Sequence, residues 1–89
     1  MRFSIARLCG GKALMVSPAD DLGIDTKKAA DVLSGIGVVK ENDDSMIIMS
    51  WKGMEVTVYR NGKIMFHPLS DRDAAVEHAA YLLRSISGS

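Results

Sequence analysis

The stretch from Ser45 to Pro68 constrains the fold most strongly, because it predicts three consecutive strands joined by two tight turns. Between Met46 and Trp51 the side chains fall into two alternating sets, the period of two expected for a strand in a two-faced sheet. Lys52-Gly53 and Asn61-Gly62 stand where two-residue hairpin loops would lie. Asn-Gly is the strongest short hairpin signal, because both central positions of a type I′ turn need a positive φ.

These two turns also predict the register of the three strands. With Lys52-Gly53 as the first loop, the facing pairs are Trp51–Met54, Met49–Val56 and Ile47–Val58. With Asn61-Gly62 as the second loop, the facing pairs are Val58–Met65 and Val56–His67. One side of the sheet is then almost wholly apolar and forms the core face. The opposite side, which is too apolar for an ordinary solvated face, consists of Met46, Ile48, Ser50, Glu55, Thr57, Tyr59, Ile64 and Phe66.

The chain before this meander predicts one strand and one helix start. Residues Arg2 to Cys9 alternate as a strand that Gly10-Gly11 ends, while residues 12–16 either extend this strand or form its hairpin partner. Ser17-Pro18-Ala19-Asp20 has the features of a helix start, with a capping Ser, a Pro at the first helical position and an acid in the first turn.

Two amphipathic helices flank the central strands. The first is capped by Asp25 or Thr26 and stopped by Gly35 and Gly37, and a short strand over residues 38–41 follows it. The second begins after a cap at Ser70 or Asp71. Its apolar stripe comprises Ala75, Val76, Ala79, Leu82, Leu83 and Ile86, and residues 85–89 are expected to fray.

The predicted order is strand, helix, four strands, helix. We therefore expect an α+β fold of two layers, an antiparallel sheet of about five strands (β-α-β-β-β-β-α) with two helices on one face. The 89 residues form a single domain over 1–89. The second sheet face is either covered by residues 12–23 or left open as an interface, and we favour the interface.

Charge and composition exclude several classes of function. Eleven acidic and eleven basic residues cancel, so the chain as a whole creates no field that would gather nucleic acid or an anionic membrane. A single cysteine, Cys9, excludes an intramolecular disulfide. No run approaches the roughly 20 apolar residues that span a bilayer. We expect a soluble, cytoplasmic protein without membrane contact.

The hairpin around Tyr59 and the helix after it resemble one half-repeat of the TATA-binding protein. The matching segments are Thr57-Val58-Tyr59, Arg60-Asn61-Gly62, Lys63, Ile64-Met65-Phe66 and the helix from Asp71. They cover about the last third of the chain in detail, and the rest agrees in the order of its elements. The resemblance implies a sheet whose open face binds the DNA minor groove, with apolar wedges between base steps.

On this resemblance, Tyr59 and Phe66 would stack or wedge against bases, and Arg60 and Lys63 would contact phosphates. The chain departs from the family in three ways: it holds one half-repeat instead of two, its basic residues are not in excess, and Glu55 lies on the predicted binding face. Phosphate contacts supply most non-specific affinity, so these departures weaken the nucleic-acid interpretation.

Other chemistry-bearing residues have simpler structural explanations. Cys9 is expected to be a small buried or half-buried side chain, and His67 and His78 are expected at a strand end and on the polar side of a helix. Two isolated histidines do not make a zinc site, so no metal is predicted. The acidic pairs at 20–21 and 43–44 fit turn and cap chemistry.

These observations favour a small non-enzymatic interaction module without a cofactor. Its partner would be another protein or a second copy of the chain, bound through Met46, Ile48, Thr57, Tyr59, Ile64 and Phe66. The first alternative is a nucleic-acid-binding protein of TATA-binding-protein-like fold. The second alternative is a small-molecule binder or enzyme with a site between sheet and loop around Cys9 to Asp21, for which no positioned base and nucleophile can be named.

Overall fold

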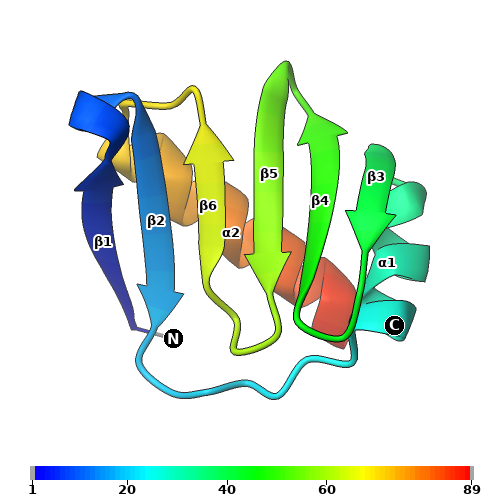
Figure 1. Cartoon of the computed structure of the whole chain (residues 1–89). Helices are drawn as coiled ribbons and strands as arrows, with labels where there is room; N and C mark the ends of the chain where they lie inside the picture. The colour runs from blue at the N-terminus through cyan, green and yellow to red at the C-terminus, as the bar shows by residue number, and fades with distance from the viewer. Residues whose placement is uncertain (1, 89) are drawn as a thin grey trace.

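Six antiparallel strands form one sheet in the order β1-β2-β6-β5-β4-β3 in the computed structural model, which describes residues 2–88 except the side chain of Cys9. The strands are β1 Phe3–Leu8, β2 Ala13–Pro18, β3 Val38–Asn42, β4 Met46–Trp51, β5 Met54–Tyr59 and β6 Ile64–His67. Helices α1 (Thr26–Ser34) and α2 (Arg72–Ser87) lie on the same side of the sheet (Figure 1). The predicted α+β class is confirmed, with six strands in place of about five.

The sixth strand comes from the segment after the double glycine. A 3₁₀ turn over Cys9–Gly11 reverses the chain, and β2 returns antiparallel to β1 and pairs with β6 on its other side. Residues 12–16 therefore belong largely to a hairpin partner. The helix start predicted at Ser17-Pro18 is wrong, because pairing with Ser4 and Phe3 holds both residues extended at the end of β2.

Residues 12–23 do not cover the second sheet face. Half of them form β2 itself, and the connection from β2 to α1 passes along one end of the sheet (Figure 1). There the Leu22 N–H donates to the Asn61 carbonyl at 3.0 Å and the Ile24 N–H donates to the Arg60 carbonyl at 2.7 Å. The face opposite the helices is left open by this segment.

The β4–β5 hairpin has the predicted register. Trp51 faces Met54 and Ile47 faces Val58. Lys52 and Gly53 have φ values of 52° and 76°, the positive values that a type I′ turn requires at both central positions.

The predicted β5–β6 register is wrong by one residue. The loop contains three residues, Arg60-Asn61-Gly62, in which only Gly62 has a positive φ (101°). The Gly62 N–H donates to the Tyr59 carbonyl at 2.9 Å, and the Tyr59 N–H donates to the Lys63 carbonyl at 2.8 Å. This is a turn followed by a left-handed residue, the usual three-residue hairpin. Val58 therefore faces Ile64, and every side chain of β6 changes face.

This shift places the apolar residues of β6 in the core. Ile64 and Phe66 are fully buried under the helices, so their assignment to the second sheet face is wrong. They join a cluster formed by both helices and the inward residues of β2, β4, β5 and β6. Its largest fully buried side chains are Phe66, Leu14, Leu33, Ile47, Met49, Ile64 and Leu82.

Of the two cap residues predicted for each helix, the aspartate is the cap in both cases. The Asp25 carboxylate accepts from the Lys27 and Lys28 N–H groups at 3.0 and 3.3 Å, and Asp71 accepts from Ala74 at 3.1 Å. These bonds satisfy N–H groups that a helix start leaves without partners. Helix α2 continues to Ser87, so it extends past residue 85, where fraying was expected. None of the helices within residues 2–88 is long and apolar enough to cross a membrane.

Candidate functional site

The open sheet face, meaning the face of the sheet opposite α1 and α2, carries a continuous apolar centre. Met15 of β2, Met65 of β6, Thr57 of β5 and Ile48 of β4 follow one another across four adjacent strands. Directly facing residues in neighbouring strands have Cβ atoms about 4.5–5.5 Å apart, so these side chains are in contact range. Tyr59 and Met46 form the next pair along the strands.

The apolar centre consists of Met15, Met46, Ile48, Tyr59 and Met65, all partly exposed. Thr57 lies among them and is only 3% exposed, because its neighbours cover it. Three of the five side chains are methionines, which are unbranched and adapt their shape to different partners.

Four of the six side chains predicted for this surface lie on it, and two do not. Met46, Ile48, Thr57 and Tyr59 are on the open sheet face, whereas Ile64 and Phe66 point to the helices. The prediction missed Met15 and Met65. The place of Met65 on the open face could have been predicted by treating Arg60-Asn61-Gly62 as a three-residue loop. That of Met15 could have been predicted from the alternation of residues 13–18 as a strand.

The predicted phosphate contacts lie at the β5–β6 loop, Arg60 as its first residue and Lys63 directly after it. Both are exposed, and the Lys63 carbonyl accepts from the Tyr59 N–H at 2.8 Å. Two carboxylates share the same face. Glu41 faces Ile48, and the Glu55 Oε2 lies 3.4 Å from the Lys40 Nζ. The face therefore carries charges of both signs around its apolar centre.

The turn between β3 and β4 contains Asp43 and Asp44 and forms the acidic corner of this face. Asp43 holds this turn in place. Its Oδ1 accepts from the Ser45 Oγ at 2.7 Å, the Ser45 N–H at 2.8 Å and the Met46 N–H at 3.0 Å. The hydroxyl bond of Ser45, followed by the two backbone bonds, lowers the pKa of the Asp43 carboxyl below its ordinary value. The same bonds hold the start of β4, where Met46 begins the apolar centre.

A second feature, an aromatic cluster on the helix side, was not predicted. The Tyr81 ring stacks on Trp51 with centroids 5.9 Å apart and planes 3° apart, and His78 meets Trp51 edge-on at 5.0 Å. His78 was expected on the polar side of its helix, but it is half-buried against Trp51 and Phe66. The spacing of 78 and 81, three residues apart on one helical face, is the signal that could have found the pair.

The aromatic cluster borders an open hollow of about 640 Å³ that also touches Lys52 and Glu77. The Lys52 ammonium group at this hollow already has an aromatic partner, because its Nζ lies 5.3 Å from the centre of the Trp51 ring. Trp51 is only 7% exposed, so the cluster mainly packs α2 against the β4–β5 hairpin. It contributes to the fold more clearly than to binding.

Among the described side chains between Gly10 and Asp21, no reactive set is brought together. The side chain of Cys9 lies outside the described part of the chain. Asp21 accepts from the Gly23 N–H at 2.9 Å in a local turn, and Asp20 is exposed. Among the residues that the structure describes, no three His, Cys, Asp or Glu side chains gather as a metal site would require.

Comparison with known proteins adds no identity: no protein-family model, no curated protein and no solved structure matches the chain. The resemblance to a TATA-binding half-repeat stays a prediction from sequence. The function must therefore be argued from the open sheet face itself.

Proposed function

We propose that this chain is a small non-enzymatic module that binds another protein molecule through the open sheet face. The observation that carries the proposal is the apolar centre, five adjoining large side chains on a face that neither helix covers. Contiguous apolar patches of this kind are unusual on monomers and commonly mark interaction sites. The single cysteine is compatible with a reducing, cytoplasmic setting, which we include in the proposal.

The size of the face suits a modest protein interface. Six strands spaced about 4.8 Å apart, with about five residues rising 3.3 Å each, span on the order of 500 Å². Two such faces would bury roughly 1,000 Å² in total, near the lower limit for a specific interface. We therefore expect a complex that forms and separates readily.

The nucleic-acid alternative has weaker support. Arg60 and Lys63 lie at one end of the face, but Glu41 and Glu55 lie across its other half and would repel phosphate. A protein partner can pair with charges of both signs around an apolar centre. Nucleic acid cannot pair with both signs, because its backbone carries only negative charge.

The methionines allow the proposal to be tested residue by residue. In a chain labelled with [methyl-¹³C]methionine, the methyl signals of Met15, Met46 and Met65 report on the open sheet face. Those of Met49 and Met54, buried in the core, serve as controls in the same spectrum. The labelled chain is measured across its own concentration series and in a lysate of its source cells.

Shifts or broadening confined to the three open-face methyls, and absent in a Tyr59→Ser variant, would support the proposal. Tyr59 is partly exposed, so this variant is expected to stay folded, which its core methyl signals would show. If the open-face methyls respond in neither series, the face does not bind protein and the proposal is wrong. A response only to added duplex DNA, lost at high salt, would favour the nucleic-acid alternative.

A further inference from the structure

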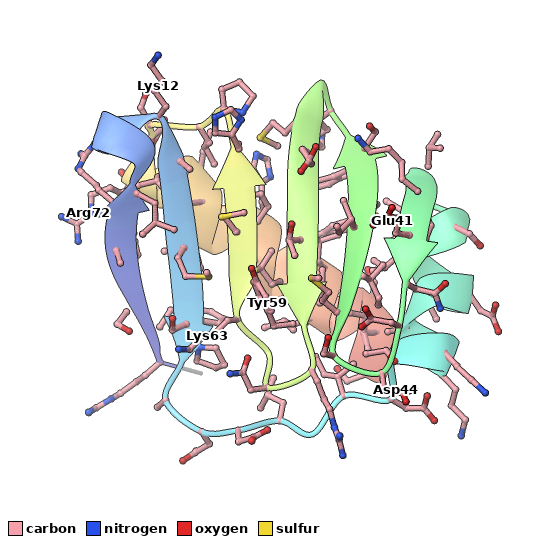
Figure 2. The ribbon with its side chains drawn as sticks, in the orientation of Figure 1. Lys12, Glu41, Asp44, Tyr59, Lys63 and Arg72 are labelled. Carbon is pink, nitrogen blue, oxygen red and sulfur yellow. The ribbon has the colours of Figure 1, made fainter. Side chains whose placement is uncertain are left out.

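Charges around the open sheet face are separated by strand. The half built from β1, β2 and β6, residues 2–18 and 63–67, contains no Asp or Glu, and its cations around the open face are Arg2, Lys12 and Lys63. Arg7 pairs with the buried Leu14 and therefore lies on the helix side of β1. The half built from β5, β4 and β3, residues 38–59, contains four acids, Glu41, Asp43, Asp44 and Glu55, against two lysines. Figure 2 shows Lys12 toward the β1 edge, Glu41 and Asp44 toward the β3 edge, and Tyr59 between them. The zero net charge of the chain thus hides a basic half and an acidic half.

We propose that the partner on this face is a second copy of the chain, related by a two-fold axis parallel to the strands. This inference rests on the proposed function. This axis lies in the plane between the two copies, over the middle of the sheet where β6 and β5 adjoin. As a result β1 faces β3 of the other copy, β2 faces β4, and β6 faces β5. The contact is isologous, with the same surface used by both copies.

Because the contact is symmetric, this axis brings each pair of opposite charges together twice, once from each copy. The basic half of each copy meets the acidic half of the other, with Arg2 at the β1 end near Asp44 of the β3–β4 turn. In the apolar centre, Met15 meets Ile48 and Met65 meets Thr57, because each pair lies in the same row across the sheet. The usual rotation of about 30° between packed sheets leaves these long side chains within reach.

The charge separation also excludes the other simple arrangement. A two-fold axis perpendicular to the strands would place β1 over β1 and β3 over β3. Basic residues would then face basic residues and acids would face acids, which disfavours association. The position of the charges therefore selects one geometry.

Charge reversal tests the geometry directly. The first variant, Arg2→Glu with Lys63→Glu, changes the charge of the basic half on the open face from +3 to −1, so that both halves are acidic. The second, Glu41→Lys with Asp44→Lys, removes the acidic half. All four side chains are exposed, so folding is expected to be retained. Each variant alone should repel its own copy and raise the dissociation constant by about tenfold or more. An equal mixture should form a mixed dimer.

Matched controls carry the same charge changes away from the face. Lys27→Glu with Lys28→Glu on α1 equals the first variant in net charge, and Asp31→Lys with Glu77→Lys equals the second. All four control positions are exposed on the helix layer. Both controls should dimerise as the unchanged chain does, which separates local pairing from repulsion by net charge.

The measurement is solution mass by light scattering from micromolar to millimolar concentration, with methionine methyl spectra of the same samples. A mass approaching twice 9.6 kDa, with the variant pattern above, supports the inference. A monomer at every concentration overturns it, as would dimers that survive both charge reversals. If the chain stays monomeric but its open-face methyls respond to lysate, only this inference fails. If they respond to neither, the proposed function fails as well.

Discussion

The two faces of strand β6 are alike in sequence and differ in environment. Ile64 and Phe66 point to the helices and are fully buried, whereas Met65, between them, is partly exposed on the open sheet face. All three are large apolar residues, so composition does not distinguish core from surface here. Register does, because a shift of one residue exchanges the two faces. An apolar residue on one face of β6 therefore packs into the core, and on the other face it stays partly accessible to solvent.

The largest expected effect contrasts the two faces within β6. Phe66→Ala should destabilise the chain by about 3–5 kcal/mol, because it leaves a cavity under the helices. Met65→Ala should cost less than about 1 kcal/mol, because its side chain is already partly solvated. Urea denaturation of both variants measures the difference. Equal losses would mean that the open sheet face is covered within the monomer.

The next effect concerns the loop that sets this register. A Cβ at Gly62 would lie 2.8 Å from the Leu22 Cδ1 and 2.9 Å from the Pro18 Cγ, in a residue whose φ is 101°. Gly62→Ala should therefore cost about 2–4 kcal/mol, combining left-handed strain with a steric clash.

Gly53→Ala is the control for this substitution. Gly53 also has a positive φ, but a Cβ there meets nothing within 4 Å, so only the conformational cost of about 1–2 kcal/mol applies. Thermal unfolding of the two variants provides the test. A smaller loss at Gly62 than at Gly53 would contradict the packing of this loop against the β2–α1 connection.

These loops also explain what the sequence could and could not predict. The caps Asp25 and Asp71 and the Lys52-Gly53 turn were predictable because each depends on neighbours in the chain. Asn61-Gly62 fits a two-residue and a three-residue loop equally well from local signals. In the structure, the carbonyls of Arg60 and Asn61 accept bonds from the distant β2–α1 connection, so long-range contacts hold the three-residue form.

The candidate site was half predictable for the same reason. Ile48 and Tyr59 follow from the local β4–β5 hairpin, whose turn was identified correctly. Met15 and Met65 each have a local signal, but only the pairing of β2 with β6, two strands far apart in the sequence, makes them neighbours. His78 illustrates the other limit, because its contact with Trp51 depends on how α2 lies across the sheet.

A smaller effect concerns pH at the acidic corner of the open face. Asp43 has a lowered pKa in the folded chain, so it contributes stability that is present at neutral pH. That stability is lost as the pH falls below the ordinary value of 3.8 and through the lower folded value. Asp43→Asn keeps an acceptor oxygen but cannot titrate there, so its stability should fall less between pH 5 and pH 2 (about the range of this titration).

The check is the urea midpoint of both chains across this pH range. Asp44→Asn, at the neighbouring exposed carboxylate, is the matched control for the change in charge. If Asp43→Asn and the unchanged chain lose stability in parallel, the bonds from Ser45 and Met46 do not set the titration of this turn.

The smallest effect is expected for the Lys40–Glu55 ion pair on the open face. The two side chains are 45% and 51% exposed, and their charged atoms lie 3.4 Å apart. Water screens such a pair, so a cycle of Lys40→Ala, Glu55→Ala and the double variant should give a coupling below about 0.5 kcal/mol. Measured on dilute, monomeric chain, this value tests whether the face is solvated. If the coupling rises with concentration, a second molecule must be displacing water from Glu55, whereas a large coupling already present in the monomer would show that the chain shields this face itself.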